Sequence, residues 1–380
     1  MKVLHLVTSL NPGGIERWVL SMLETIHRSD CQMDLCCQGF ERGRWAYKAE
    51  ALGAKVFLNT LTPDHFVFGM RLAKILRRGG YDILHIHVGV YSGFAVWIGH
   101  EMNVKVITTF HCVDFPAERW FLKLPVVESV RSVYAKWSIK YAVKESDFLV
   151  GVSQGTLDEF VPERSKFVSK AFVIPHGVNI STPKPEQSRY LFLSKLGYDE
   201  DSRVIIHVGR FSAQKNHRGV LNIFKKVSEN VADARLILVG DGYLRYEIER
   251  MAHELSLGDK IAFLGFRNDV DEILAHCDLM LMPSLFEGFG IVTIEAAAAG
   301  LPVVGSRVAG LVEAVEDGQT GLLFEVHDHD GMADAIVRLL LDSGFAKKMG
   351  EAGKQRVRDH LSIEKMAAQY LQLYEQCLKQ

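Results

Sequence analysis

The sequence predicts an α/β fold made of two doubly wound domains, each with a parallel sheet that helices cover on both faces. The length of 380 residues exceeds one usual domain and suits two. Short, nearly all-apolar runs of strand length alternate with helical segments in both halves, as in parallel sheets. Each half also opens with the same order of strand, glycine-containing loop and helix.

In the first half, residues 2–8 form an apolar run of strand length that leads into Pro12-Gly13-Gly14. An amphipathic pattern over residues 16–26 then predicts a helix. Further strands are expected at residues 83–88, 104–109, 148–152 and 172–174.

The second half repeats the order from residue 203, with a strand at residues 204–208, a polar loop at 210–217 and a helix at about 219–227. Strands are expected at residues 236–239, 261–263, 279–282 and 303–304, the third within a longer strand-like run over 273–283. The proline-containing, polar stretch 179–189 is typical of a linker. We therefore expect domains at 1–178 and 179–361, and a helix over 362–380 that packs back on the first domain.

Composition is ordinary for a soluble globular protein, with 48% hydrophobic and 24% charged residues. The net charge of −2 hides an asymmetry, because residues 1–178 hold 21 Lys and Arg against 17 Asp and Glu, leaving 23 against 29 in the rest. This favours an anionic partner for the first half, such as a phosphate-bearing acceptor or an anionic membrane, although ordinary scatter explains it equally well. Nucleic-acid binding is not expected, since no basic stripe accompanies a recognised module.

The six cysteines show neither metal-ligand spacing nor a disulfide framework, so we expect reduced thiols. The longest weakly polar run, residues 88–99, falls well short of the roughly 20 residues that span a bilayer. No signal peptide is recognisable at the N-terminus. We expect a cytoplasmic location, at the inner face of the membrane if the acceptor is lipid-linked.

Two carboxylates, Glu287 and Glu295, bracket a glycine-bearing turn that runs into an alanine-rich helix. The start of this helix would present unpaired backbone N–H groups near Gly290 and Ile291, and such an end attracts phosphate. Glu287 could then accept hydrogen bonds from sugar hydroxyls and Glu295 from a ribose diol. The segment indicates a nucleotide-sugar site; the alternative is a core helix that carries an incidental Glu.

Arg210 and Lys215 lie in the loop after the strand that opens the second half, where a diphosphate could sit. Two cations there would stabilise the charge of a departing diphosphate; the alternative is a solvated basic loop. His111 follows a predicted strand and would place an imidazole at a cleft edge, although a histidine in such a position is more often structural. His85 and His87 alternate along another strand, but that pair alone is weak support for a metal, and we assign none.

Together, Glu287 and Glu295 with their glycine turn, Gly209-Arg210 with Lys215, Pro12-Gly13-Gly14, Thr109-Phe110-His111 and Ile174-Pro175-His176-Gly177-Val178 resemble family-4 retaining glycosyltransferases of GT-B architecture. The resemblance covers nearly the whole chain. It implies two Rossmann-like domains that face an interdomain cleft, the first binding the acceptor and the second the nucleotide-sugar donor.

The resemblance also implies roles for individual residues. Arg210 and Lys215, beside Gly209, would hold the donor diphosphate, Glu295 the ribose hydroxyls and Glu287 the transferred sugar. Gly290 and Ile291 would offer backbone N–H groups to phosphate or sugar, and the loop with Gly13 and Gly14 would approach the diphosphate. His111 would contact the transferred sugar, and Phe266 would lie at the nucleobase.

Such enzymes need no divalent metal or other cofactor for transfer. An Asp-x-Asp triplet at Asp328 and Asp330 lies late in the chain, away from these loops, and is interpreted as a solvated turn. No carboxylate in the first domain stands out as a nucleophile. The family therefore favours a front-face mechanism, in which the leaving phosphate helps to deprotonate the acceptor.

Residues 118–145 hold six basic residues against three acidic ones, interleaved with aromatic residues. Such a face suits an interfacial helix, so one hypothesis is that it touches the membrane where a lipid-linked acceptor lies; the alternative is a helix packed on its own domain.

The leading functional hypothesis is transfer from a nucleotide sugar, most often a UDP-sugar, to a glycan or lipid-linked acceptor in polysaccharide or cell-envelope assembly. The alternatives are a soluble transferase making a small glycoside and an inactive sugar-nucleotide-binding scaffold subunit.

Overall fold

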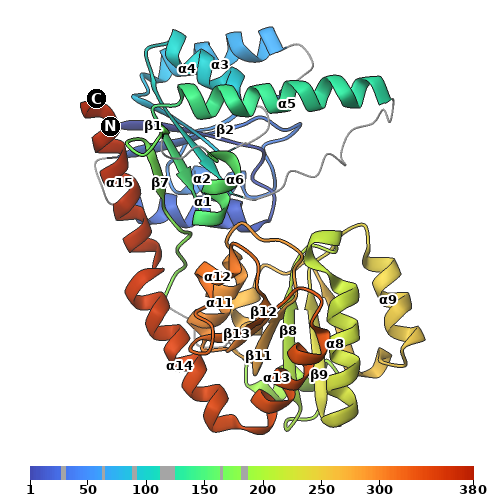
Figure 1. Cartoon of the computed structure of the whole chain (residues 1–380). Helices are drawn as coiled ribbons and strands as arrows, with labels where there is room; N and C mark the ends of the chain where they lie inside the picture. The colour runs from blue at the N-terminus through green and yellow to red at the C-terminus, as the bar shows by residue number, and fades with distance from the viewer. Residues whose placement is uncertain (27–30, 62–64, 88–91, 112–124, 163–165, 181–186) are drawn as a thin grey trace. The chain divides into compact units, whose positions relative to one another are not determined.

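The computed structural model describes residues 1–26, 31–61, 65–87, 92–111, 125–162, 166–180 and 187–380 (Figure 1). The chain divides into two compact units. The N-terminal unit consists of Met1–His176 together with Ile363–Gln380, and the C-terminal unit of Gly177–Ser362. Each unit is built around its own parallel sheet.

The sheet of the N-terminal unit has the strand order β3-β2-β1-β4-β5-β6-β7. Its strands are β1 (Lys2–Val7), β2 (Gln32–Cys37), β3 (Val56–Leu58), β4 (Ile83–Ile86), β5 (Lys105–Phe110), β6 (Phe148–Gly151) and β7 (Ala171–Val173). The order reverses between β1 and β4, and ligands of open α/β sheets bind beyond the strand ends at such a switch point.

The helices of this unit are α1 (Gly14–Ile26), α2 (Ala46–Ala51), α3 (His65–Gly79), α4 (Ser92–Glu101), α5 (Pro125–Glu145), α6 (Gln154–Phe160) and α15 (Ile363–Lys379). Apolar spacing along α1 buries Trp18, Val19, Met22, Leu23 and Ile26. The helix α15 comes from the far end of the chain and packs beside α1, where the Trp18 indole N–H donates to Met366 Sδ at 3.3 Å (Figure 1).

The sheet of the C-terminal unit has the order β10-β9-β8-β11-β12-β13, with its switch point between β8 and β11. Its strands are β8 (Arg203–Val208), β9 (Ala234–Val239), β10 (Ile261–Gly265), β11 (Leu279–Met282), β12 (Val303–Ser306) and β13 (Gly321–Phe324). Its helices are α7 (Arg189–Lys195), α8 (His217–Asn230), α9 (Arg245–Glu254), α10 (Val270–Leu274), α11 (Ile291–Ala299), α12 (Leu311–Ala314), α13 (His329–Leu341) and α14 (Ser343–His360), with 3-10 turns η2 (Ala213–Lys215) and η3 (Gly258–Lys260).

The structure confirms the predicted doubly wound α/β fold, but corrects one element. The run 273–283 is not a continuous strand, because Ile273 and Leu274 end helix α10 and only Leu279–Met282 forms β11. A turn separates them, in which the backbone N–H of Cys277 donates to the carbonyl of Leu274 at 3.1 Å. Short apolar runs do not distinguish a buried helix from a strand. Among the described residues, no helix is long and apolar enough to cross a membrane.

Candidate active site

The glycine turn before α11 has the backbone that the sequence pattern requires. Gly290 caps the helix with φ of 78°, and a Cβ built there would lie 2.7 Å from Leu311 Cδ2. The Thr293 hydroxyl donates to the Gly290 carbonyl at 2.6 Å and fixes the first turn. The helix therefore begins at Ile291, where its first backbone N–H groups have no carbonyl partner within the helix.

The loops that follow the neighbouring strands β8 and β11 are tied together by hydrogen bonds. Asn216 adopts a left-handed conformation, caps α8 by accepting from the Gly219 N–H at 3.1 Å, and donates to the Pro283 carbonyl at 2.9 Å. The Leu285 N–H donates to the Gln214 carbonyl at 2.9 Å. The switch point of this sheet thus carries one connected loop structure rather than two independent loops.

Within this structure, Lys215 and Glu287 form a buried ion pair. Lys215 Nζ lies 2.5 Å from Glu287 Oε1, and the two side chains are 16% and 6% exposed. Because both side chains are largely removed from solvent, the ammonium offsets part of the cost of burying the carboxylate. The structure therefore brings together two residues that the sequence places in separate motifs.

Arg210 extends from the same loop into solvent and forms no ion pair with the described residues. Gly209 precedes it, and a Cβ there would lie 3.0 Å from Lys215 Cγ. Across from it, Gly240 has φ of +133°, and its Cβ would lie 2.0 Å from the Gly209 carbonyl oxygen. The close approach of the two backbones thus depends on glycine at position 240, whereas a Cβ at position 209 would crowd the Lys215 side chain.

Glu295 and Phe266 lie further along the same unit. Glu295 is half-buried on α11, the helix that begins next to Gly290. Phe266 follows β10 and Gly265, whose φ is +66°, and its ring is 45% exposed. An exposed aromatic ring can stack on a planar base.

Two buried histidines beside these loops were not recognised from the sequence. His207 lies in β8, and its Nδ1–H donates to the Leu281 carbonyl at 2.9 Å. His217 begins α8 and stacks on Phe211 with ring centroids 3.9 Å apart. Burial lowers the pKa of His207 to about 4 and that of His217 to about 2, so both rings are neutral at physiological pH beside Lys215. Their proximity to Gly209 and Lys215 in sequence was the available signal.

In the N-terminal unit, Gly13 and Gly14 form the turn between β1 and α1. A Cβ at Gly13 would lie 2.4 Å from the carboxylate of Glu16. The turn is braced from a distant segment, because the Trp45 N–H donates to the Leu10 carbonyl at 2.9 Å. Gly14 is exposed at the start of α1, where backbone N–H groups lack carbonyl partners within the helix.

His111 directly follows β5 and is 7% exposed. Its Nε2 lies 2.8 Å from His87 Nδ1, and its Nδ1 lies 3.0 Å from His176 Nε2. Burial lowers the pKa of His111 to about 3. Both ring nitrogens are therefore already engaged by other histidines, a contact that the sequence did not predict.

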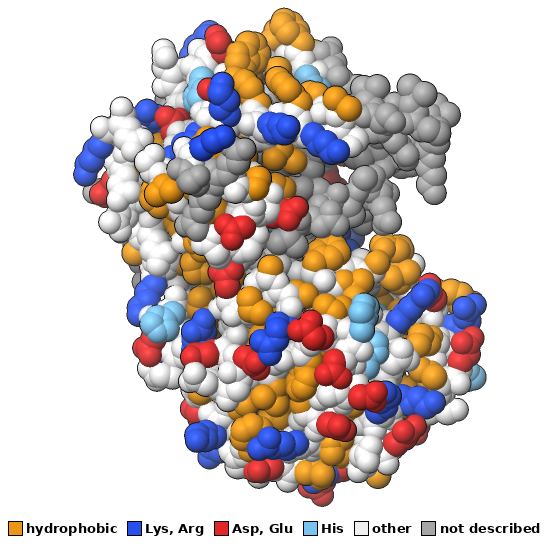
Figure 2. Space-filling view, in the orientation of Figure 1, with side chains coloured by type: hydrophobic (Ala, Val, Ile, Leu, Met, Phe, Trp, Pro, Cys, Tyr) orange, Lys and Arg blue, Asp and Glu red, His pale blue; other side chains and the backbone are white. Residues whose placement is uncertain are grey.

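The segment 118–145 corresponds in part to α5; residues 118–124 lie outside the described residues. One side of α5 packs on its own unit, where Ser138 Oγ accepts from the Gly93 N–H at 2.9 Å and the Tyr134 hydroxyl lies 2.9 Å from His65 Nδ1. The other side is exposed, with Trp137 at 53% and Val133 at 69%. Lysines 136, 140 and 144 are also exposed. In Figure 2, basic and hydrophobic side chains lie next to one another over this unit.

The Asp-x-Asp triplet has helix-capping and surface contacts. Asp328 caps α13 by accepting from the Gly331 N–H at 2.9 Å, and Asp330 pairs with Lys226. Neither carboxylate lies in the loops described above.

Comparison with known proteins agrees with this architecture. The profile described as Glycosyltransferase Family 4 matches residues 12–182, and the one described as Glycosyl transferases group 1 matches residues 191–356. An Anabaena protein, Alr3699/HepE, solved in complex with UDP-glucose, superimposes with a TM-score of 0.84 at 21% identity, covering 99% of this chain and 100% of that one. Two doubly wound domains in one chain with this likeness define the GT-B fold, and the two matching family profiles make the chain a glycosyltransferase.

Two named relatives, each similar to this chain over most of its length, support the assignment to a family. N-acetyl-alpha-D-glucosaminyl L-malate synthase of Bacillus anthracis is 30% identical over 83% of this chain and 80% of its own length. UDP-Gal:alpha-D-GlcNAc-diphosphoundecaprenol alpha-1,3-galactosyltransferase of Escherichia coli is 26% identical over 98% of this chain and 96% of its own. The chain belongs to glycosyltransferase family 4.

Proposed function

We propose that this glycosyltransferase moves a sugar from a UDP-sugar to a glycan or lipid-linked acceptor, with retention of the anomeric configuration and without a divalent metal. The observation that carries the proposal is the buried Lys215–Glu287 ion pair beside Arg210, at the switch point between β8 and β11. Ligands of open α/β sheets bind at such a point. Cations there would meet the diphosphate, and a carboxylate there would meet sugar hydroxyls.

The C-terminal unit offers a separate group to each part of the donor. Arg210 and Lys215 hold the diphosphate, and the start of α11 at Gly290 and Ile291 donates backbone N–H groups to it. Glu287 accepts from hydroxyls of the transferred sugar. Further along, Glu295 accepts from the ribose and the exposed ring of Phe266 lies at the nucleobase.

In the proposed reaction, the bond from the anomeric carbon to the diphosphate breaks while a bond to the acceptor oxygen forms on the same face of the sugar. The acceptor hydroxyl gives its proton to the departing diphosphate. Arg210 and Lys215 stabilise the negative charge that grows on this leaving group, which is the largest contribution expected of a fixed electrostatic site. Cations and a helix terminus supply this charge stabilisation in place of a metal ion.

The donor and acceptor assignments rest on the relatives. The Anabaena neighbour was solved with UDP-glucose, and the Escherichia coli relative is named for UDP-Gal and a diphosphoundecaprenol acceptor. Acceptors of that kind lie at a membrane, and cell-envelope assembly is the corresponding setting. The cations and exposed aromatic rings of the N-terminal unit suit this surface.

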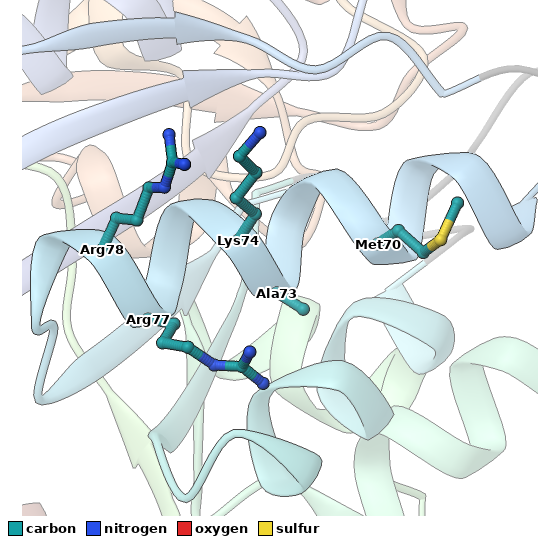
Figure 3. Close-up of a pocket in the computed structure, with 5 residues that line it drawn as sticks. All are labelled: Met70, Ala73, Lys74, Arg77 and Arg78. Atoms are coloured by element: carbon teal, nitrogen blue, oxygen red, sulfur yellow. The ribbon is translucent and has the colours of Figure 1, made fainter.

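Two surfaces of the N-terminal unit support a membrane contact. On α5, Trp137 is exposed among lysines. On α3, an open pocket of about 480 Å³ is lined by Met70, Ala73, Lys74, Arg77 and Arg78. Figure 3 shows Lys74 and Arg78 pointing to one side of α3 and Arg77 to the other. Anionic lipid headgroups are attracted to such clusters at roughly 1 kcal/mol per cation.

A second candidate function is the synthesis of a small glycoside on a soluble acceptor. It is favoured by the 30% identity to the Bacillus anthracis malate glycoside synthase. An inactive scaffold subunit is the third candidate, and the occupied charged positions 210, 215, 287 and 295 argue against it.

Thermal-shift measurements with UDP-, GDP- and ADP-sugars test the donor first. A ligand at 100 times its Kd stabilises the protein by about 2.7 kcal/mol, so we expect a clear shift with a UDP-sugar. Assays of transfer to undecaprenyl-diphosphate sugars and to malate then distinguish the two acceptor classes. NMR of the anomeric proton in the product shows whether the configuration is retained, and activity in the presence of EDTA shows whether a metal is needed. Donor binding without transfer to any acceptor would favour the scaffold, and no shift with any nucleotide sugar would refute the proposal.

A further inference from the structure

A hydrogen-bonded chain of four histidines runs through the interior of the N-terminal unit. His5 Nδ1 lies 2.9 Å from His87 Nε2, His87 Nδ1 lies 2.8 Å from His111 Nε2, and His111 Nδ1 lies 3.0 Å from His176 Nε2. All four side chains are buried, with at most 7% exposed. Each link has the same polarity, with Nδ1 of one ring facing Nε2 of the next.

Parallel strand pairing places most of these rings on one side of the sheet. His5 in β1 pairs in register with His85 in β4, and His87 follows two residues later. Side chains two residues apart in a strand share a face. Trp18 of α1 packs edge-on to His87, His111 and His176, with ring centroids 5.4–5.6 Å apart. The rings are thus held by the fold and not only by each other.

A chain of neutral imidazoles with this polarity has two consistent states. A neutral ring has one N–H donor and one acceptor nitrogen. If His5 carries its proton on Nδ1, then His87 accepts on Nε2 and must carry its own proton on Nδ1. The same reasoning applies in turn to His111 and His176. The four rings are therefore all Nδ1–H or all Nε2–H. Burial lowers the pKa of every member, which keeps the rings neutral.

The two ends of the chain are equivalent in this respect. In the Nε2–H state the terminal proton lies on the buried Nε2 of His5, and in the Nδ1–H state it lies on the buried Nδ1 of His176. What the hydrogen bonds fix is therefore that all four rings share one tautomer and change it together.

We propose that His87 and His176 are positioning residues that set the ring orientation and tautomer of His111 through this chain. The part that His111 plays in transfer rests on the proposed function. His111 is linked to His176 through Nδ1 and to His87 through Nε2, and it donates at one of these nitrogens and accepts at the other. A sugar hydroxyl that reaches His111 must therefore take the place of one of these partners, and the tautomer fixed by the rest of the chain decides whether His111 donates to it or accepts from it.

Metal binding is a different interpretation of the same cluster, because ligand atoms of His5, His85 and His87 lie within 4.8 Å of one another. The hydrogen bonds of His85 argue against it. Its Nδ1 lies 2.7 Å from the Tyr374 hydroxyl and its Nε2 lies 2.7 Å from Thr109 Oγ1. Both nitrogens of His85 are thus occupied, as are both nitrogens of His87, so a metal would have to break a hydrogen bond at each of these two rings.

The first experiment uses ligand-free full-length protein labelled with ¹⁵N-histidine. Long-range ¹H–¹⁵N correlation spectra identify the protonated nitrogen of each ring, with assignments from single His→Gln variants. We expect one common tautomer, either Nδ1–H at all four rings or Nε2–H at all four, for His5, His87, His111 and His176 between pH 6 and 8. Mixed tautomers within the chain, an imidazolium in this range, or a stoichiometric response of His5, His85 and His87 to added Zn²⁺ would overturn the proposal. No nucleotide sugar is present, so this result is independent of the proposed function.

The second experiment compares variants with the best donor found for the wild type. His87→Phe keeps a ring but removes both links, and we expect kcat to fall on the order of 10-fold with little change in the donor KM, as for a misplaced catalytic group. His87→Gln retains a donor and an acceptor and should recover most of the loss. Tyr374→Phe removes a hydroxyl bonded to His85 outside the chain and serves as the matched control, expected within about twofold of wild type. Equal losses in His87→Phe and Tyr374→Phe would indicate a merely structural cluster and refute the positioning role, whereas an inactive wild type would refute only the proposed function.

Discussion

Glu287 and Lys215 are 72 positions apart in sequence, yet Glu287 Oε1 and Lys215 Nζ lie 2.5 Å apart in a largely buried part of the C-terminal unit. The pair joins the loop after β8 to the loop after β11. A buried ion pair stabilises a fold little compared with apolar packing, but breaking it leaves an uncompensated charge. We therefore propose that the pair at this switch point serves ligand binding rather than stability.

We expect Lys215→Ala and Glu287→Ala each to lower turnover by on the order of 10²-fold or more, as does the loss of a fixed electrostatic group. Each should also reduce the free energy of unfolding of the C-terminal unit by about 3–5 kcal/mol, because one buried charge remains unpaired. The double variant should lose less stability than the sum of the two. Urea denaturation and steady-state kinetics measure both effects, and additive stability losses would contradict the pairing.

Arg210→Ala should separate activity from stability. The side chain is exposed and forms no ion pair with the described residues, so we expect the melting temperature to stay close to that of the wild type. Loss of a charge-assisted hydrogen bond to diphosphate costs about 1.5–3 kcal/mol, which corresponds to roughly 10- to 100-fold in kcat/KM for the donor. Arg218→Ala, an exposed cation paired with Glu247 on the same unit, is the control. Comparable kinetic losses in the two variants would argue against a specific role for Arg210.

Gly290→Ala can be compared with Gly318→Ala, because the two glycines have φ of 78° and 77°. The backbone penalty of about 1–2 kcal/mol is therefore common to both. A Cβ at Gly290 would meet Leu311 Cδ2 at 2.7 Å, whereas nothing lies within 4 Å of one at Gly318. We expect Gly290→Ala to be the more destabilising in urea and to weaken donor binding in calorimetry. Equal effects would show that the contact with Leu311 does not matter.

Acidification should destabilise the N-terminal unit. Burial lowers the pKa of His5 and His111 from 6.5 to about 3. Between these pH values the unfolded chain binds protons that the folded chain does not, so stability rises with pH up to about 6.5 and is level above it. Each ring contributes up to about 1.4 kcal/mol per pH unit in that range.

Urea midpoints at pH 7.5, 6.0 and 5.0 measure this effect while carboxylates stay largely ionised. Hydrogen exchange in β4 and β5 assigns the loss to the N-terminal unit. The slope should persist at high salt, because desolvation is the cause, and Coulombic repulsion is what salt screens. A urea midpoint that stays constant from pH 7.5 to 5.0 would contradict the burial of these rings in their neutral form.

Binding to anionic vesicles should depend on the exposed face of α5. Trp137→Ala with Lys140→Glu removes one exposed ring and reverses one charge, and we expect co-sedimentation with phosphatidylglycerol vesicles to fall several-fold. Lys348→Glu, at an exposed lysine on α14, reverses the same amount of charge and is the charge-matched control. Wild-type protein that stays in the supernatant would remove the membrane contact and favour a soluble acceptor.

Much of the fold could be predicted because its central strands are uninterrupted apolar runs, as in Leu279–Met282. Strands β2, β3 and β13 were not predicted, for reasons that differ between them. β2 contains Asp34, whose carboxylate accepts from the Tyr81 hydroxyl at 2.7 Å and from the Lys55 N–H at 2.7 Å. Both partners are distant in sequence, so no local pattern reveals why a charged residue is buried there. β3 and β13 are short strands at sheet edges, where the apolar signal is weak.

Residue types in the candidate site were visible in the sequence, whereas their contacts were not. Arg210, Lys215 and Glu287 could be identified from charge and glycine spacing. The histidine alternation at His85 and His87 was also visible, but the chain to His111 requires the strand order and register that bring β1, β4 and β5 together. Distances between motifs arise from topology, which periodicity does not encode.

The C-terminal helix α15 gives the N-terminal unit an unusual order of assembly. Tyr374 from this helix bonds His85 at 2.7 Å, and Met366 receives the indole N–H of Trp18, so one wall of the first unit comes from residues that follow the whole second unit. During synthesis the ribosome releases β1 to β7 long before α15. Synthesis of the N-terminal unit thus begins first and its folding is completed last, and until α15 emerges Trp18 and His85 lack these two partners.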